Sequence, residues 1–138
     1  MNEYTFEECN IGLEESFTVS VTEEMMRMFC DISGDENPMH MDAEYASKHG
    51  YDNRLVYGLL TTSFYSRLVG MRLPGKYCIL KSIDVSYERP VYIGDVLTVT
   101  GRVKEKDDRF MQILIKGRIK NQFGKTVSKS TIIAGFYE

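Results

Sequence analysis

The chain has 138 residues, of which 43% are hydrophobic and 27% are charged, and its formal net charge at pH 7 is -3. This length predicts one domain spanning residues 1–138, large enough to fold around an apolar core without a metal or a disulfide. The mild negative charge and the scattered lysines and arginines argue against nucleic-acid binding.

The cysteines and the apolar stretches limit where the protein can work. Cys9, Cys30 and Cys78 are widely spaced and form no CxxC pair, which argues against disulfides or a zinc site and is typical of a reducing compartment. The N-terminal residues are acidic, so we expect no signal peptide. The apolar stretch at residues 55–73 is too polar for a membrane span. We therefore expect a cytoplasmic protein without membrane contact, metal or cofactor.

A strand and a helix are predicted first. Residues 16–21 alternate in polarity, which is typical of a short strand. Thr22 can cap a following helix, and Gly34 can end it. Pro38 keeps the next residues out of that helix, so we expect a rigid loop there.

Two further helices follow this loop. Asp42 can cap a short helix over residues 43–49, and a longer helix is predicted from about residue 55 to residue 72, where Pro74 follows. The longer helix is apolar on nearly every side, which indicates a helix enclosed by other structure.

The second half of the chain changes its period. Apolar residues alternate over 83–91, 97–103, 111–119 and 127–137, and polar or glycine-containing turns separate these segments. Such regular turns indicate an antiparallel meander. Because no later helix is available to cover these strands, the economical arrangement is a sheet curved around the long helix. The expected fold class is α+β.

Asp35 and His40 form the first candidate site. A carboxylate and an imidazole are the groups most often used to move protons near neutral pH. Between them, Asn37 can make local turn bonds and Pro38 fixes its own torsion, so both can support the loop. An ordinary surface turn, with His40 in a polar niche, stays an open alternative.

Gly58, near the start of the long helix, is the second candidate. The first N–H groups of a helix lack acceptors and favour developing negative charge, and a missing side chain lets a ligand carbonyl approach them. Such a donor can stabilise an oxyanion. Close packing of the helix on the sheet explains the glycine as well. No nucleophile elbow surrounds Ser63 or Ser66, and the histidines lack further ligands at metal-binding spacing.

Residues 29–42, Phe-Cys-Asp-Ile-Ser-Gly-Asp-Glu-Asn-Pro-Met-His-Met-Asp, closely resemble the signature of the MaoC-like, (R)-specific enoyl-CoA hydratases. The resemblance continues through residues 56–66, 73–75 and 87–95, so it covers nearly the whole chain. It implies a single hot-dog domain, in which an antiparallel sheet wraps around a long buried helix. It also implies a homodimer whose sheets join edge to edge.

The resemblance implies hydration or dehydration of enoyl and 3-hydroxyacyl thioesters, carried by CoA or by an acyl-carrier protein. By matching position, Asp35 and His40 would activate the water, and the N–H of Gly58 would bind the thioester oxygen. Ser66 matches a serine that supports the site from the helix. Many members have histidine where this chain has Tyr57, a change expected to alter the pocket wall and the acyl preference.

Two other functions stay open. Hot-dog thioesterases also use carboxylates, although the Asn-Pro-x-His context argues against hydrolysis. A non-catalytic acyl-binding or assembly subunit would keep the fold but has no need of both Asp35 and His40. The residues fix neither the acyl length nor its branching, and neither the carrier nor the physiological direction.

Overall fold

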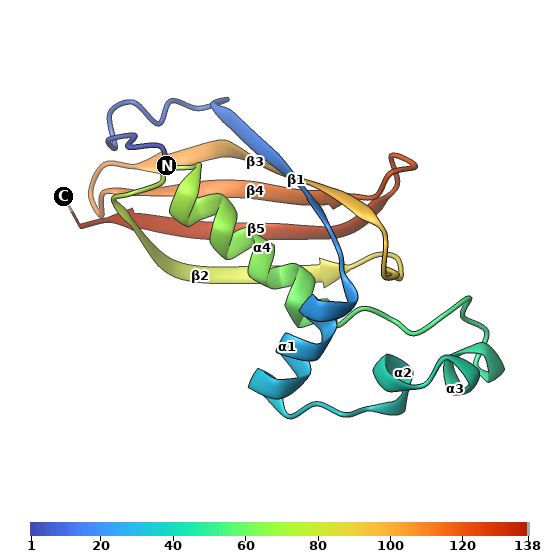
Figure 1. Cartoon of the computed structure of the whole chain (residues 1–138). Coiled ribbons are helices and arrows are strands. Elements are labelled where there is room, and N and C mark those ends of the chain that lie inside the picture. Colours follow the sequence, from blue (N-terminus) through green and yellow to red (C-terminus); the bar gives the residue numbers. More distant parts are fainter. Residues whose placement is uncertain (138) are drawn as a thin grey trace.

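The computed structural model describes residues 1–137. All strands belong to one antiparallel sheet: β1 (Glu14–Ser20), β2 (Cys78–Tyr87), β3 (Val96–Asp107), β4 (Gln112–Lys120) and β5 (Thr126–Phe136). The helices are α1 (Glu23–Ser33), α2 (Pro38–Met41), α3 (Ala43–Lys48) and α4 (Gly58–Met71). The sheet curves around α4, while α1, α2 and α3 gather beyond one end of it (Figure 1). The predicted α+β class is confirmed.

The helix ends predicted from local chemistry are confirmed. The Thr22 hydroxyl accepts a hydrogen bond from the N–H of Met25 at 3.2 Å, which caps α1. Gly34 ends α1 with φ of 72°, a left-handed conformation that costs glycine little. Asp42 caps α3 by accepting hydrogen bonds from the backbone N–H groups of its first turn.

The expectation of a loop that continues through His40 is wrong, because α2 begins at Pro38. Proline suits the first position of a helix, where its missing N–H would have no intrahelical acceptor. The Asn37 side chain caps α2 by accepting from the N–H of Met39 at 3.0 Å. His40 therefore sits in a short helical turn, which fixes its backbone.

The long helix begins later than predicted, at Gly58 and not near residue 55. The preceding residues are extended because their backbone groups already have partners in other segments. The N–H of Leu55 donates to the Met39 carbonyl at 2.9 Å, and the N–H of Val56 donates to the Val91 carbonyl at 2.8 Å. These bonds leave Gly58 as the first residue of α4.

The meander prediction is confirmed for β3, β4 and β5 but is wrong for β2. The strand order is β1-β3-β4-β5-β2, so β2 pairs with β5 at one edge and β1 pairs with β3 at the other. The connection from β2 to β3 spans residues 88–95 and carries the chain across to the other side of β4 and β5. Alternating polarity fixes which face of a strand is buried but does not fix its neighbour.

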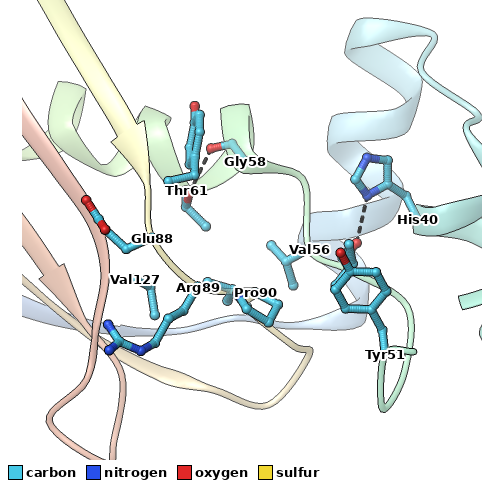
Figure 2. A pocket seen from close by; sticks show the side chains of 12 residues that line it. His40, Tyr51, Val56, Gly58, Thr61, Glu88, Arg89, Pro90 and Val127 are labelled. Atoms are coloured by element: carbon cyan, nitrogen blue, oxygen red, sulfur yellow. Dashed lines mark hydrogen bonds between the residues drawn. The ribbon is translucent and has the colours of Figure 1, made fainter. Parts of the chain in front are cut away.

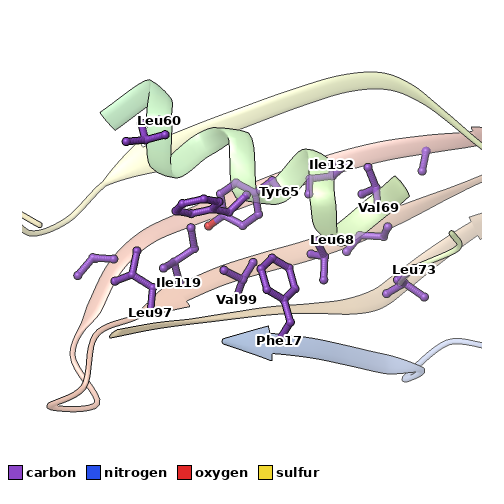
Figure 3. Close-up of a cluster of buried hydrophobic side chains, with 14 of the residues drawn as sticks. Phe17, Leu60, Tyr65, Leu68, Val69, Leu73, Leu97, Val99, Ile119 and Ile132 are labelled. Carbon is purple, nitrogen blue, oxygen red and sulfur yellow. The ribbon is translucent and has the colours of Figure 1, made fainter. Parts of the chain in front are cut away.

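The core lies between α4 and the concave face of the sheet (Figure 3). Two paired glycines, Gly101 on β3 and Gly117 on β4, let the helix approach this face closely. A Cβ at Gly101 would lie 2.7 Å from the Leu68 side chain, and one at Gly117 would lie 2.7 Å from the Tyr65 ring. Both distances are shorter than packed atoms allow, so glycine is required here.

One side of α4 is not covered within the chain. Its inner face buries Phe64, Tyr65 and Leu68, whereas Leu59 is 67% exposed and Met71 is 44% exposed. The prediction of a helix enclosed on every side is therefore wrong for a single copy. Leu59 and Met71 lie twelve residues apart, and the exposed residues of α4 between them are polar, so these two side chains do not form a continuous apolar patch.

Candidate active site

Local hydrogen bonds fix the backbone around Asp35. Its N–H donates to the Ser33 hydroxyl at 3.1 Å, and the N–H of Asn37 donates to Asp35 Oδ1 at 3.0 Å. Asn37 also caps α2, whose first residue is Pro38, so the turn is tied at both ends. These contacts occupy one carboxylate oxygen of Asp35 and leave Oδ2 turned toward His40. The supporting role expected for Asn37 and Pro38 in the site stays a prediction.

The imidazole of His40 is held by a backbone carbonyl. Its Nδ1 lies 2.8 Å from the carbonyl oxygen of Leu55. Because a carbonyl only accepts, Nδ1 carries the hydrogen in this contact, and the neutral ring presents Nε2 as an acceptor. The side chain is 19% exposed, so the free nitrogen faces a partly enclosed space. This is the tautomer that a general base needs at Nε2.

Asp35 and His40 lie close together but do not bond directly. His40 Nε2 is 4.0 Å from Asp35 Oδ2, which is longer than a hydrogen bond. A water molecule that contacts both atoms would lie about 2.8 Å from each, an ordinary hydrogen-bond distance. The pair can therefore hold one water between two acceptors and remove a proton from it.

His40 and Gly58 line one cavity of about 370 Å³ (Figure 2). The other residues that line it come from the segment before α4, from α4 itself, from the end of β2 and its following loop, and from β5: Tyr51, Leu55, Val56, Thr61, Tyr87, Glu88, Arg89, Pro90, Val91 and Val127. Asp35 does not line the cavity and reaches it through His40. A space of this size can hold part of an acyl thioester.

Gly58 lines this cavity, and its N–H has no hydrogen-bond acceptor within the described part of the chain. As the first residue of α4, Gly58 has no intrahelical acceptor for this N–H. The packing explanation also has support, because a Cβ at Gly58 would lie 3.0 Å from the Tyr87 ring. Tyr87 itself bonds to the Thr62 hydroxyl at 2.6 Å. The absence of a side chain at Gly58 thus allows the close contact with the Tyr87 ring, and the N–H of Gly58 is left without an acceptor among residues 1–137.

The predicted residues Tyr57 and Ser66 lie elsewhere. Tyr57 does not line the cavity that His40 and Gly58 share: its ring stacks on the His40 ring, with centroids 4.1 Å apart, and both side chains line a second cavity of about 710 Å³. Ser66 is exposed on α4, two turns beyond Gly58, and also lies outside the cavity lining. The roles predicted for both residues stay predictions. Sequence reasoning did not single out the Leu55 carbonyl, which carries no side-chain signal, or Tyr87, whose position depends on where β2 joins the sheet.

Among residues 1–137, histidine, cysteine and acidic side chains do not gather in groups of three or more that could hold a metal ion. Within the same residues, each helix is too short or too polar to cross a lipid bilayer.

A family model described as a MaoC like domain matches residues 8–124. The (R)-specific enoyl-CoA hydratase of Rhodospirillum rubrum is 34% identical over 105 residues, covering 73% of this chain and 73% of that protein. A mitochondrial 3-hydroxyacyl-[acyl-carrier-protein] dehydratase of Arabidopsis thaliana is 39% identical over 72 residues, covering 52% of this chain and 42% of that protein. The unliganded R-hydratase of Pseudomonas aeruginosa has a TM-score of 0.90 and 30% identity, over 97% of this chain and 86% of that chain.

The matches and the geometry agree on one fold. The family model spans most of the chain, from before β1 to the turn between β4 and β5, and so includes Asp35, His40 and Gly58. The structural match extends over the sheet and helices together, as expected for a hot-dog fold. The chain belongs to the MaoC-like domain family.

Proposed function

We propose that the protein is a hydro-lyase that adds water across the α,β double bond of an enoyl thioester and removes it from the corresponding (R)-3-hydroxyacyl thioester. One observation carries the proposal: His40 and Gly58 line the same cavity, and Asp35 faces the free nitrogen of His40. A base that activates water and a donor for an oxyanion are the two elements that this reaction requires.

The chemistry follows from these positions. Water held between Asp35 and His40 loses a proton to Nε2 as its oxygen bonds to the β-carbon. The π electrons of the double bond move toward the thioester, and the N–H of Gly58 stabilises the negative charge on its oxygen. Asp35 stabilises the imidazolium that forms. The pair then returns a proton to the α-carbon, so the site regains its starting protonation and one water has been added.

The carrier is either CoA or an acyl-carrier protein. The relative from Rhodospirillum rubrum is named for enoyl-CoA, and the relative from Arabidopsis thaliana is named for an acyl-carrier protein. Both carriers present an acyl thioester on the same pantetheine arm, and a narrow cavity contacts this arm and the acyl group but not the rest of the carrier. Assays therefore need both kinds of substrate.

The working form that we propose is a homodimer in which β2 of one copy pairs with β2 of the other. β2 is an edge strand, and its exposed side chains include the apolar residues Ile79, Leu80 and Tyr87. The other edge, β1, exposes polar residues along its length. An unpaired apolar edge is a ready site for strand addition. The uncovered side of α4, which carries Leu59, would meet the same partner.

Hydration of crotonyl-CoA tests the function. Loss of the enoyl absorbance, with an (R)-3-hydroxybutyryl product on chiral chromatography, is the expected result. Longer enoyl-CoA substrates and enoyl-acyl-carrier-protein substrates follow if the short substrate reacts slowly. Release of free thiol without hydration would replace the proposal with thioester hydrolysis. Tight acyl-CoA binding without turnover of any thioester would replace it with a binding role.

A further inference from the structure

Tyr57 joins the two parts of the candidate site. It is the residue before α4 and is only 2% exposed, yet its side chain makes no cap hydrogen bond to the helix that follows. The side chain turns back instead toward the segment that carries Asp35 and His40. A buried tyrosine usually satisfies its hydroxyl, and the partner chosen here belongs to that segment.

Two separate contacts join Tyr57 to the acid–base pair. The Tyr57 ring stacks on the His40 ring, with centroids 4.1 Å apart and planes at 29°. The Tyr57 hydroxyl donates a hydrogen bond to the backbone carbonyl of Asp35 at 2.6 Å. The Phe29 ring also packs on the Tyr57 ring, with centroids 4.7 Å apart and planes tilted at 46°. One buried side chain therefore contacts the imidazole and the backbone that bears the carboxylate.

These contacts complete the restraint of His40. The Leu55 carbonyl holds Nδ1 and so fixes the rotation of the imidazole in its own plane. The Tyr57 ring covers one face of the imidazole and fixes the tilt of that plane. Nε2 has no hydrogen-bond partner among residues 1–137 and lies 4.0 Å from Asp35 Oδ2. A restraint on both members of the pair keeps the distance between them constant.

We propose that Tyr57 is a positioning residue that holds Asp35 and His40 at the separation needed to grip one water molecule. The inference rests on the proposed hydration activity. It gives Tyr57 a task behind the acid–base pair, whereas the sequence pointed to the wall of the acyl pocket. Misplacement of reacting groups by about 1 Å can slow an enzyme about a hundredfold. A side chain that keeps Asp35 and His40 at a fixed separation therefore has a large effect on the rate.

Tyr57 does not itself exchange protons in this role. Its side chain does not line the cavity that holds His40 and Gly58. Burial raises the pKa of the Tyr57 hydroxyl to about 12, so it remains a hydrogen-bond donor throughout the pH range in which enzymes of this kind work. The carbonyl that it contacts can only accept, which fixes the direction of the bond.

Kinetics of two variants separate the contacts. Tyr57→Phe keeps the ring and removes the bond to Asp35, and we expect kcat to fall about tenfold with KM nearly unchanged. Tyr57→Leu removes both contacts, and we expect a fall of about a hundredfold. Tyr65→Phe is the matched control, because Tyr65 lies on α4, which follows Tyr57, is fully buried and forms a hydrogen bond with Ser128 at 2.9 Å. It should lose stability but keep its kcat.

Imidazole NMR tests the positioning without turnover. The chain has two histidines, and His49 serves as the internal reference because its Nδ1 contacts the Tyr45 carbonyl, away from Tyr57. We expect His40 to show one Nδ1–H tautomer in the unsubstituted protein and in Tyr57→Phe. In Tyr57→Leu we expect a mixture, because an imidazole without the stacked ring can turn away from the Leu55 carbonyl that selects this tautomer. The His49 signals should not change.

The two measurements give distinct outcomes. If the unsubstituted protein hydrates no thioester, the proposed function fails, and the histidine spectra alone decide whether Tyr57 positions His40. If Tyr57→Leu keeps both its kcat and a single His40 tautomer, the positioning role is refuted. A fall in kcat for Tyr65→Phe equal to that for Tyr57→Phe would also refute it, because general loss of packing would then explain both.

Discussion

Gly58→Ala separates the two explanations of this glycine. The added methyl group would lie 3.0 Å from the Tyr87 ring, which has to move by a few tenths of an ångström. Tyr87 is 51% exposed and its hydroxyl is held by Thr62, so the ring can move outward into solvent. The backbone of Gly58 has ordinary helical torsions that alanine adopts without strain.

The structure therefore predicts a small cost in stability and a large cost in activity. Overpacking costs about 1–3 kcal/mol in a closed core, and at this open contact we expect the free energy of unfolding to fall by about 1 kcal/mol or less. The same methyl group stands beside the N–H that the thioester oxygen must reach. Loss of one oxyanion donor costs about a hundredfold or more, and we expect kcat/KM to fall by about that factor.

Gly70→Ala is the matched control. Gly70 lies in the same helix, and a Cβ there would have no other atom within 4 Å. This variant should gain about 0.5–1 kcal/mol, because alanine is the better helix former. Urea unfolding and enoyl-thioester hydration are measured on both variants. The reasoning is refuted if Gly58→Ala keeps kcat/KM within about tenfold, which is about 1.4 kcal/mol, or if it unfolds at neutral pH.

Three further predictions concern the acid–base pair, a buried thiol and the sheet edge. Asp35→Asn and His40→Ala should each slow hydration about a hundredfold or more, and full activity in either variant removes that residue from the mechanism. Burial raises the pKa of Cys9 from 9.0 to about 11, so the free energy of unfolding should fall by about 1–2 kcal/mol as the pH rises through this window. Cys9→Ala should reduce that pH dependence in urea titrations, and part of it should remain because burial also raises the pKa of Cys78 to about 11. Light scattering should give twice the 15.9 kDa of one chain, and Leu80→Asp should return the mass to that of a monomer.

Short-range features of the fold were predictable from the sequence. The cap of α1 at Thr22 and its end at Gly34 depend on residues within one helical turn, so local chemistry decides them. The same holds for Asp42 at the start of α3. From Pro38 we correctly expected that α1 does not continue into the following residues, but the expected loop through His40 is the helix α2. Proline interrupts a helix that precedes it, and equally well begins one that follows it.

The position of β2 could not be predicted from polarity. Partly buried and exposed residues alternate only over residues 82–86 of β2, and that pattern is satisfied beside β3 as well as beside β5. The choice depends on how the whole sheet closes around α4. For this reason Tyr87 was missed as a neighbour of Gly58, although both belong to segments that the family resemblance had marked.

The candidate site shows the same division between local and distant contacts. Asp35 and His40 are five residues apart in the sequence, so their proximity was predictable from residue types and a tied turn. The Tyr57 contact with Asp35 joins residues 22 positions apart, and the substitution of histidine by tyrosine suggested a change in the pocket wall. The Tyr57 side chain packs against the His40 ring and not into the wall of the cavity that His40 and Gly58 share. The space that accepts its ring is formed by tertiary packing, which the sequence alone does not show.

The stretch before α4 connects all parts of the site. The N–H of Leu55 bonds to the Met39 carbonyl, and its own carbonyl holds His40. Val56 bonds to the loop after β2, and Tyr57 holds the Asp35 backbone. Because this stretch runs directly into Gly58, a displacement of it would move Asp35, His40 and the N–H of Gly58 together. The relative geometry of Asp35, His40 and Gly58 therefore depends on the contacts of three consecutive residues, 55–57.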